Sequence, residues 1–331
     1  MSFDKRKKPV DEIISGNYTA DGKIMSISGG LYKIKLDESG KNVFCRARGA
    51  FRHSGLTPLV GDNVVLRSDK PTDELIGSET EGGIMIESVK ERKNALIRPP
   101  MANLDCIFVS MAAAAPAPIL ATVDKLIAIA EHNKIEPYIV VGKSELDRDT
   151  AEEIKRIYTL AGFKVFTLSC VTGEGVEEIS RFVRENLAGK TAAFSGASGV
   201  GKSTLMNLLF PNLKLETGDI SHKIERGKHT TRSVDLYEAE LDGGILYIAD
   251  TPGFSMLDFK QFDFFDKEAL PYTFREFDDY IGECRYTKCT HTKEDGCAIL
   301  EAIREGKIAK SRHESFLELY EVLKNKKEWD K

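Results

Sequence analysis

The chain has 331 residues, of which 41% are hydrophobic and 30% are charged. This composition is typical of a globular protein, and the length allows two or three domains with separate cores. The net charge of −5 excludes a uniformly basic nucleic-acid-binding surface, and no apolar run approaches the ~20 residues of a membrane span. Because no apolar stretch follows the charged N-terminal segment, we expect a cytoplasmic protein with no membrane partner.

Residues 16–95 predict a small β-barrel. Short alternating segments at 20–27, 31–36, 42–49 and 61–66 are separated by turns, a pattern typical of an OB-fold. Residues 41–61 contain no acid, but they do contain Lys41, Phe44, Arg46, Arg48, Phe51, Arg52 and His53. Basic and aromatic side chains on one face suit RNA, through phosphate charge and base stacking. An equally weighted alternative is that the aromatic side chains face the core.

Residues 96–258 predict an α/β domain. Strands expected at 106–110, 138–141 and 164–169 alternate with helices at 119–133 and 149–161. Alternation of this kind implies parallel strands that are joined by helical crossovers.

A P-loop motif, Gly-x-x-x-x-Gly-Lys-Ser, follows the strand expected at 191–195. It runs through Gly196, Ala197, Ser198, Gly199, Val200, Gly201, Lys202, Ser203 and Thr204. In such a loop, backbone N–H groups surround a polyphosphate, the lysine reaches the β- and γ-phosphates, and the serine hydroxyl binds Mg²⁺. The N-terminus of the following helix adds partial positive charge. We therefore expect a nucleoside triphosphate to bind at these residues.

Two later segments predict the rest of the phosphate site. The strand at 246–250 ends in an Asp-x-x-Gly motif, in which Asp250 would hold Mg²⁺ through water and Gly253 would offer its N–H to the γ-phosphate. Thr230 and Thr231 lie in a polar stretch between the two motifs and are predicted to close on Mg²⁺ and the γ-phosphate as a switch segment.

Residue 254 is phenylalanine, where many GTPases carry the glutamine that orients the attacking water. An apolar side chain cannot position that water, so we expect slow intrinsic hydrolysis that a partner accelerates. His229 is the polar candidate for this role. A solvent-exposed loop histidine is an equally weighted alternative.

The C-terminal segment predicts a metal site. Three thiols and one imidazole lie within fourteen residues, at Cys284, Cys289, His291 and Cys297, whereas the other three cysteines are scattered. Four soft ligands of this kind suit tetrahedral, structural Zn²⁺, and reduced structural cysteines are the alternative. Basic residues between the ligands offer a second contact with RNA. Helices are expected at 298–304 and 311–327.

These motifs together resemble the circularly permuted ribosome small-subunit biogenesis GTPases, the RsgA/YjeQ family, from residue 16 to the C-terminal helix. In that family the base-recognition motifs precede the P-loop. The resemblance assigns Gly142, Lys143, Ser144 and Glu145 to the Asn-Lys-x-Asp position, and Ser169 and Cys170 to the second base-side motif. Gly142 has no amide and Glu145 is one methylene longer than aspartate. We therefore expect a guanine preference with lowered affinity or selectivity.

The resemblance implies a multidomain protein with a tail (1–15), an OB-fold RNA-binding barrel (16–95), a circularly permuted P-loop GTPase domain (96–258) and a zinc-binding helical module (259–331). It implies a monomeric GTPase that binds GTP and GDP with Mg²⁺ and carries one structural Zn²⁺. Its partners would be the small (30S) ribosomal subunit with its rRNA, which stimulates hydrolysis, and the assembly factors that it releases. An alternative is a nucleotide-gated RNA-binding protein with relaxed base specificity and incidental hydrolysis. An ATPase or nucleotide kinase is disfavoured by the Asp-x-x-Gly and switch motifs.

Overall fold

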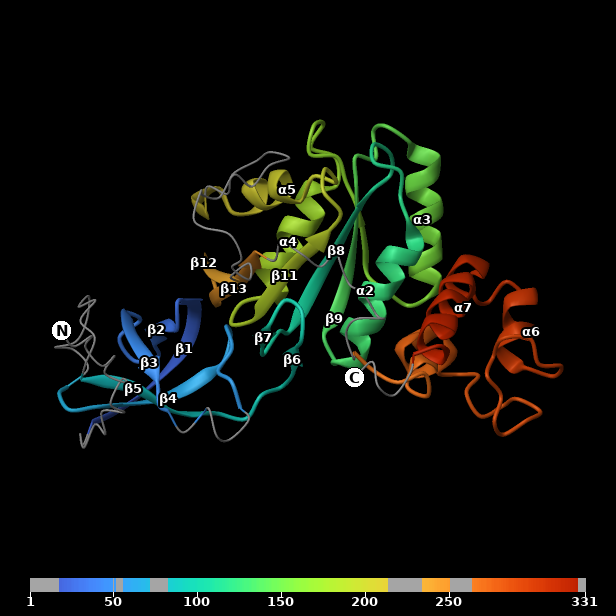
Figure 1. Ribbon diagram of the computed structural model, residues 1–331. Helices are drawn as coiled ribbons and strands as arrows, with labels where there is room; N and C mark the ends of the chain where they lie inside the picture. The colour runs from blue at the N-terminus through green and yellow to red at the C-terminus, as the bar shows by residue number, and fades with distance from the viewer. Residues whose placement is uncertain are drawn as a thin grey trace, which may run out of the picture. The chain divides into compact units, whose positions relative to one another are not determined.

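The computed structural model describes residues 18–49, 51, 56–71, 83–213, 234–250 and 264–326. The chain forms two compact units (Figure 1), the first made of residues 1–93, 100–103 and 233–236, and the second of residues 94–99, 104–232 and 237–331. The segment that leads from the first unit to the second contains two short strands, β6 (Ala95–Leu96) and β7 (Met101–Ala102).

Five strands of the first unit form a closed barrel. They are β1 (Tyr18–Ser28), β2 (Leu31–Leu36), β3 (Asn42–Ala47), β4 (Asn63–Ser68) and β5 (Ile84–Val89). Their order is β1-β2-β3-β5-β4, and β4 pairs back with β1. The β3–β5 pair is parallel and the other pairs are antiparallel. This is the strand order of an OB-fold, so the predicted barrel is confirmed.

The alternation of buried and less buried side chains along β3 shows on which face of the barrel Phe44 lies. Val43 and Cys45 are buried in the barrel, whereas Phe44 is partly buried and Arg46 is exposed. Because successive side chains of a strand point to opposite faces, Phe44 lies on the outer face with Arg46, not in the core. Phe51 is partly buried, and Arg52 and His53 lie outside the described residues.

The second unit contains a six-stranded sheet in the order β10-β9-β8-β11-β13-β12. Its strands are β8 (Cys106–Ala112), β9 (Glu136–Gly142), β10 (Val165–Thr167), β11 (Thr191–Gly196), β12 (Asp235–Leu241) and β13 (Gly244–Asp250). The five strands from β10 to β13 in this order pair in parallel. The crossovers contain α2 (Leu120–His132), α3 (Arg148–Leu160), α4 (Val176–Asn186) and α5 (Lys202–Leu209), the last followed by the 3₁₀ helix η2 (Pro211–Leu213). The predicted α/β domain is therefore confirmed.

The helices cover both faces of this sheet (Figure 1). Buried residues of α4 and α5 pack on one face against Phe108, Phe166 and Phe194, and the rings of Phe108 and Phe194 stack with centroids 4.6 Å apart. Helices α2 and α3 pack on the other face. The carboxyl ends of the parallel strands therefore meet at one edge, where the motifs follow β9, β10 and β11.

The C-terminal segment packs on α2 within the same unit. It consists of η4 (Leu270–Thr273), η5 (Arg275–Phe277), α6 (Ala298–Arg304) and α7 (Lys310–Lys324), so both predicted helices are present. Phe274, Phe277 and Phe316 form an aromatic cluster with ring centroids 5.2–5.5 Å apart. Phe274 lies between η4 and η5, and Phe277 is the last residue of η5.

A buried charge cluster ties α7 to α2. The guanidinium of Arg312 donates to Asp124 of α2 at 2.5 Å and to Glu276 at 2.6 Å, and all three side chains are at most 3% exposed. The Tyr158 hydroxyl of α3 donates to the same aspartate at 2.8 Å. These contacts attach the C-terminal helices to the crossover helices of the sheet.

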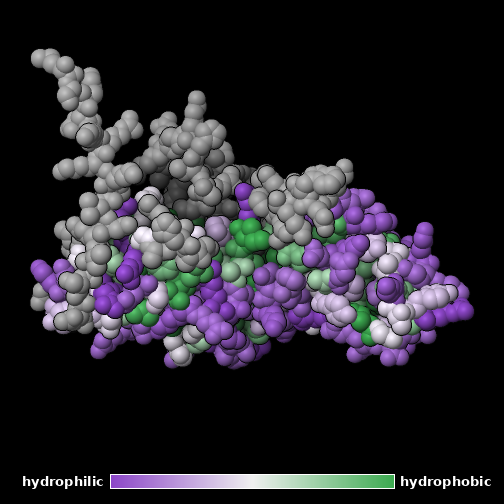
Figure 2. Space-filling view, turned by 60° about the horizontal axis from the view of Figure 1, so that its bottom comes forward, coloured by the Kyte–Doolittle hydropathy of each residue, from purple (hydrophilic) through white to green (hydrophobic). Residues whose placement is uncertain are grey.

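Among the described residues, no helix is long and apolar enough to cross a bilayer. The coloured part of the face seen in Figure 2 is mostly hydrophilic, with smaller hydrophobic areas between the hydrophilic residues.

Candidate functional site

The P-loop connects the end of β11 to the start of α5, as the motif predicts. Gly196 has a φ of 149°, and a Cβ at this position would lie 2.1 Å from the carbonyl oxygen of Ser110 in β8. Gly199 and Gly201 also have positive φ, at 75° and 98°. Glycine is required at Gly196 because the loop backbone rests directly on the neighbouring strand.

Lys202 folds back over its own loop. Its Nζ donates to the carbonyl oxygens of Gly196 at 2.8 Å and Ala197 at 2.9 Å. Ser203 is partly buried and Thr204 is exposed in the first turn of α5. The ammonium group is therefore already held over the loop, where a bound polyphosphate would compete for it.

The two base-side segments follow β9 and β10 and are joined to each other. The Ser144 N–H donates to the Leu168 carbonyl oxygen at 3.2 Å. The Ser169 hydroxyl accepts from the N–H groups of Val171 at 3.3 Å and Thr172 at 3.1 Å, which fixes the loop after β10. Both loops lie at the same edge of the sheet because β9 and β10 are parallel neighbours.

Lys143 adopts a left-handed backbone conformation, with a φ of 55°, and its Nζ donates to the carbonyl oxygen of Ala115. The loop between β8 and α2 thus supports the base-side lysine. No pattern in the sequence predicted this contact, because it uses a backbone carbonyl that any residue could supply.

A cavity of about 110 Å³ brings the predicted segments together. Its lining includes Gly142, Lys143, Glu145 and Cys170 from the base side, and Val200, Gly201, Lys202 and Thr204 from the P-loop. Val171, from the predicted base-side segment after β10, also lines the cavity. The remaining lining residues, which sequence reasoning missed, are Ser110, Met111, Val140, Leu168 and Leu205. Most of these are apolar strand or helix positions, which read in the sequence as ordinary core residues.

Glu145 brings a carboxylate to the base side of this cavity. Its Oε2 is buried and has no hydrogen-bond partner among the described residues. Burial and, after it, the negative charge of Glu145 raise the pKa of the Cys170 thiol. A carboxylate with a spare acceptor atom suits a base that offers adjacent N–H groups, as guanine does.

The remaining phosphate-side candidates are described only in part. Asp250 ends β13, where its backbone pairs with Phe194 of β11, two residues before Gly196. Its side chain lies outside the described part of the chain, as do His229, Thr230, Thr231 and Gly253. Their predicted roles therefore stay predictions.

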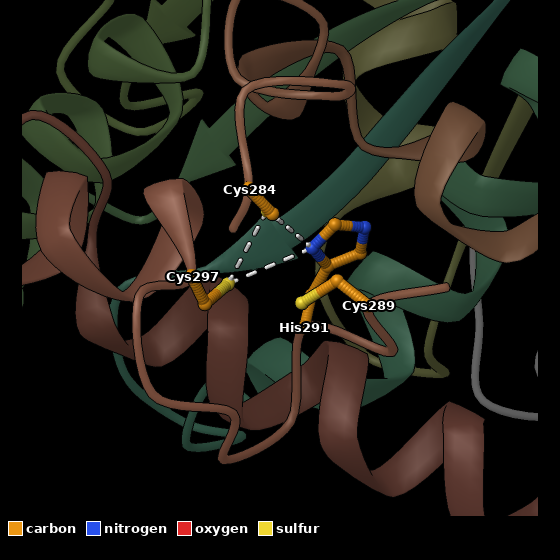
Figure 3. Close-up of side chains that lie close together, drawn as sticks. All are labelled: Cys284, Cys289, His291 and Cys297. Carbon is orange, nitrogen blue, oxygen red and sulfur yellow. Dashed lines mark hydrogen bonds between the residues drawn. The ribbon is translucent and has the colours of Figure 1, made fainter. Parts of the chain in front are cut away.

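The four predicted zinc ligands converge on one point (Figure 3). The Sγ atoms of Cys284, Cys289 and Cys297 and one ring nitrogen of His291 lie within 4.8 Å of one another. Two Sγ–Nδ1 distances are 3.6 Å, and the Sγ atoms of Cys284 and Cys297 are 3.9 Å apart. Ligand atoms about 2.3 Å from a tetrahedral Zn²⁺ are separated by similar distances, so the donor set fits this ion.

Two side chains that the sequence did not single out hold the ligand loop. Glu294 accepts from the N–H groups of Thr290 at 2.8 Å and Thr292 at 2.9 Å. Although burial raises the pKa of Glu294, hydrogen bonds from the Thr290 hydroxyl and from the N–H groups of Thr290 and Lys293 outweigh it and lower the pKa to about 2. The His313 ring of α7 lies 2.7 Å from the carbonyl oxygen of His291. The metal-ligand loop is thereby connected to α7.

An OB-fold barrel and a P-loop domain whose base-side loops precede the P-loop define the class of circularly permuted GTPases. A family model described as RsgA GTPase matches residues 89–260, and one described as RsgA N-terminal domain matches residues 21–76. The small ribosomal subunit biogenesis GTPase RsgA of Geobacillus sp. (strain WCH70) is 41% identical over 312 residues, which cover 93% of this chain and 99% of that protein. The relative of the same name from Caldanaerobacter subterraneus subsp. tengcongensis is 38% identical, over 92% of this chain and 96% of its own length.

Two solved structures agree with this class. YjeQ from Thermotoga maritima has a TM-score of 0.75 at 30% identity, covering 94% of this chain and 100% of that one. YloQ, titled a circularly permuted GTPase, has a TM-score of 0.69 at 30% identity. The match covers 95% of this chain and 98% of that one. The chain belongs to the RsgA family of GTPases, and its enzymatic class is that of a GTP hydrolase.

Proposed function

We propose that this chain hydrolyses GTP during late maturation of the small (30S) ribosomal subunit. The main support for the proposal is the cavity, which is lined by both Lys202 of the P-loop and Glu145 of the base-side loop. A site of this composition can hold the phosphates and the base of one nucleotide at the same time. The process is suggested by the relatives, which are named small ribosomal subunit biogenesis GTPases.

On the phosphate side, Lys202 would exchange the carbonyl oxygens of Gly196 and Ala197 for phosphate oxygens. Ser203 and Asp250 would hold Mg²⁺, which supplies positive charge to the developing negative charge of the transferred phosphoryl group. Thr230, Thr231 and the Gly253 N–H would complete the site, and His229 would orient water when the subunit is bound.

On the base side, the Glu145 carboxylate would accept from guanine, Lys143 would cover the ribose, and the N–H groups after Ser169 would meet the guanine carbonyl. Competition of GTP, ATP and XTP against a fluorescent guanine nucleotide tests this assignment. Displacement by ATP at the same concentration as GTP would exclude a guanine preference.

The barrel (16–95), which precedes the GTPase domain (96–258) in the chain, and the metal module (259–331), which follows it, would both bind rRNA. The outward position of Phe44 beside Arg46 supports this role for the barrel. One structural Zn²⁺ at the Cys₃His cluster would order the ligand loop. We further propose that the protein is a cytoplasmic monomer and that its hydrolysis releases assembly factors.

GTP turnover with and without isolated small subunits, in the wild type and in Lys202→Ala, tests the whole proposal. We expect stimulation by the subunit that the variant loses while it still binds the subunit. A wild type without any stimulation would instead identify a nucleotide-gated RNA-binding protein with incidental hydrolysis.

A further inference from the structure

The cavity of the nucleotide site is lined by core residues as well as by the base and phosphate motifs. Its floor is formed by Val140, Leu168 and Leu205, which are at most 2% exposed and belong to the core under α5. The base and phosphate motifs therefore account for only part of the lining of this cavity.

Ser110 contributes an unexplained polar atom to this space. The residue is 4% exposed and lines the cavity, and its Oγ has no hydrogen-bond partner among the described residues. Ser110 lies two positions after Phe108 in β8, so both side chains point to the same face of the sheet. That face carries the floor residues of the cavity, and the hydroxyl is therefore directed into it. Buried hydroxyls in proteins are normally hydrogen-bonded.

Gly142 is the reason that this space is open. A Cβ at Gly142 would lie 3.2 Å from the carbonyl oxygen of Val200 in the P-loop and 3.7 Å from that of Met111. Any side chain at this position would therefore enter the gap between the end of β9 and the P-loop. The glycine puts no side chain into this gap, and the cavity of about 110 Å³ exceeds the ~10–15 Å³ that one water molecule needs.

We propose that ordered water in this cavity bridges the Ser110 hydroxyl to the Glu145 carboxylate, and that Ser110 thereby acts as a positioning residue for guanine. Ser110 and Glu145 both line the cavity, and Ser110 Oγ and Glu145 Oε2 are buried without a partner among the residues described. A water molecule can donate to the carboxylate and accept from the hydroxyl.

The water bridge limits the conformational freedom of the Glu145 side chain. Glutamate has one more rotatable bond than aspartate, and ordering such a side chain on binding costs entropy. Water fixed by Ser110 holds one carboxylate rotamer before the base arrives. A carboxylate oxygen has two lone pairs, so Oε2 can accept from this water and from a base N–H together.

The test compares Ser110→Ala with Ser195→Ala. Ser195 is a matched control because it lies in the neighbouring strand, is 1% exposed and also has an unpartnered Oγ in the described structure, but does not line the cavity. Dissociation constants are measured for GDP and for IDP, whose base lacks the 2-amino group. We expect Ser110→Ala to weaken GDP binding about three- to tenfold and to reduce the preference for GDP over IDP. Ser195→Ala should change neither value.

Ser110→Thr, which keeps the hydroxyl, should retain the GDP preference of the wild type. The inference is overturned if Ser110→Ala matches Ser195→Ala, or if it weakens GDP and IDP equally. It rests on the proposed guanine specificity, whose failure is seen separately: wild-type protein would then bind ADP as tightly as GDP.

Discussion

Replacing Arg312 with methionine should strongly destabilise the second unit. Methionine keeps an apolar stem near Phe274, over whose ring the guanidinium lies 4.6 Å from the centroid, so the change removes mainly charge. It leaves Asp124 and Glu276, at 1% and 3% exposure, without their counter-ion. Removing one partner of a buried ion pair costs about 3–5 kcal/mol. We expect a loss of this size in the free energy of unfolding, measured by urea denaturation and circular dichroism.

Arg304→Met is the matched control. Arg304 pairs with Glu301 at 2.7 Å, but the two side chains are 64% and 55% exposed, and exposed pairs contribute about 0–1 kcal/mol. Adding Asp124→Asn to the Arg312→Met variant should recover part of the loss, because one uncompensated charge disappears. The reasoning is refuted if Arg312→Met and Arg304→Met differ by less than about 1 kcal/mol, or if the added Asp124→Asn costs further stability.

Three other predictions concern the two sites. Gly196→Ala places a methyl group 2.1 Å from the Ser110 carbonyl oxygen and should weaken binding of fluorescent GDP at least about tenfold, whereas unchanged affinity would contradict the close packing. Glu145→Gln should weaken GDP binding by about tenfold or more and leave ADP binding unchanged, because a hydrogen bond to a charged acceptor contributes about 1.5–3 kcal/mol. Chelation of the wild type, or the Cys297→Ser change, should release one equivalent of zinc and make the ligand loop sensitive to protease; unaltered digestion would argue against a structural metal.

The architecture was predictable because its signals are local. Alternating side chains predicted the barrel, and helical spacing between apolar strands predicted the α/β sheet. The P-loop and the Cys₃His cluster were also readable, because their chemistry lies within short segments. Phe44 shows the limit of this reasoning, since an alternating strand has two faces and only the burial of Val43 and Cys45 identifies the inner one.

The parts that were not predictable depend on residues far apart in the chain. Asp124 and Arg312 are separated by 188 positions, and each alone reads as a charged residue on a helix. Ser110 reads as a small residue in a buried strand, and its importance follows only from the cavity that Gly142 leaves open. Loop closure over such distances leaves no periodic signal, so only the folded structure reveals these pairs.

One set of contacts joins the metal site to the base site through α2. These contacts predict that the two sites influence each other's affinity. His313 contacts the carbonyl oxygen of the ligand His291, and the residue before it, Arg312, binds Asp124 of α2. The loop before α2 accepts a hydrogen bond from Lys143. We expect the chelated protein to bind GDP more weakly than the zinc-loaded protein, and GDP to strengthen zinc binding by the same factor, because linkage between two sites is reciprocal. Arg312→Met, which breaks the middle contact, should abolish the difference. Equal GDP affinity with and without zinc would show that these contacts only stabilise the fold.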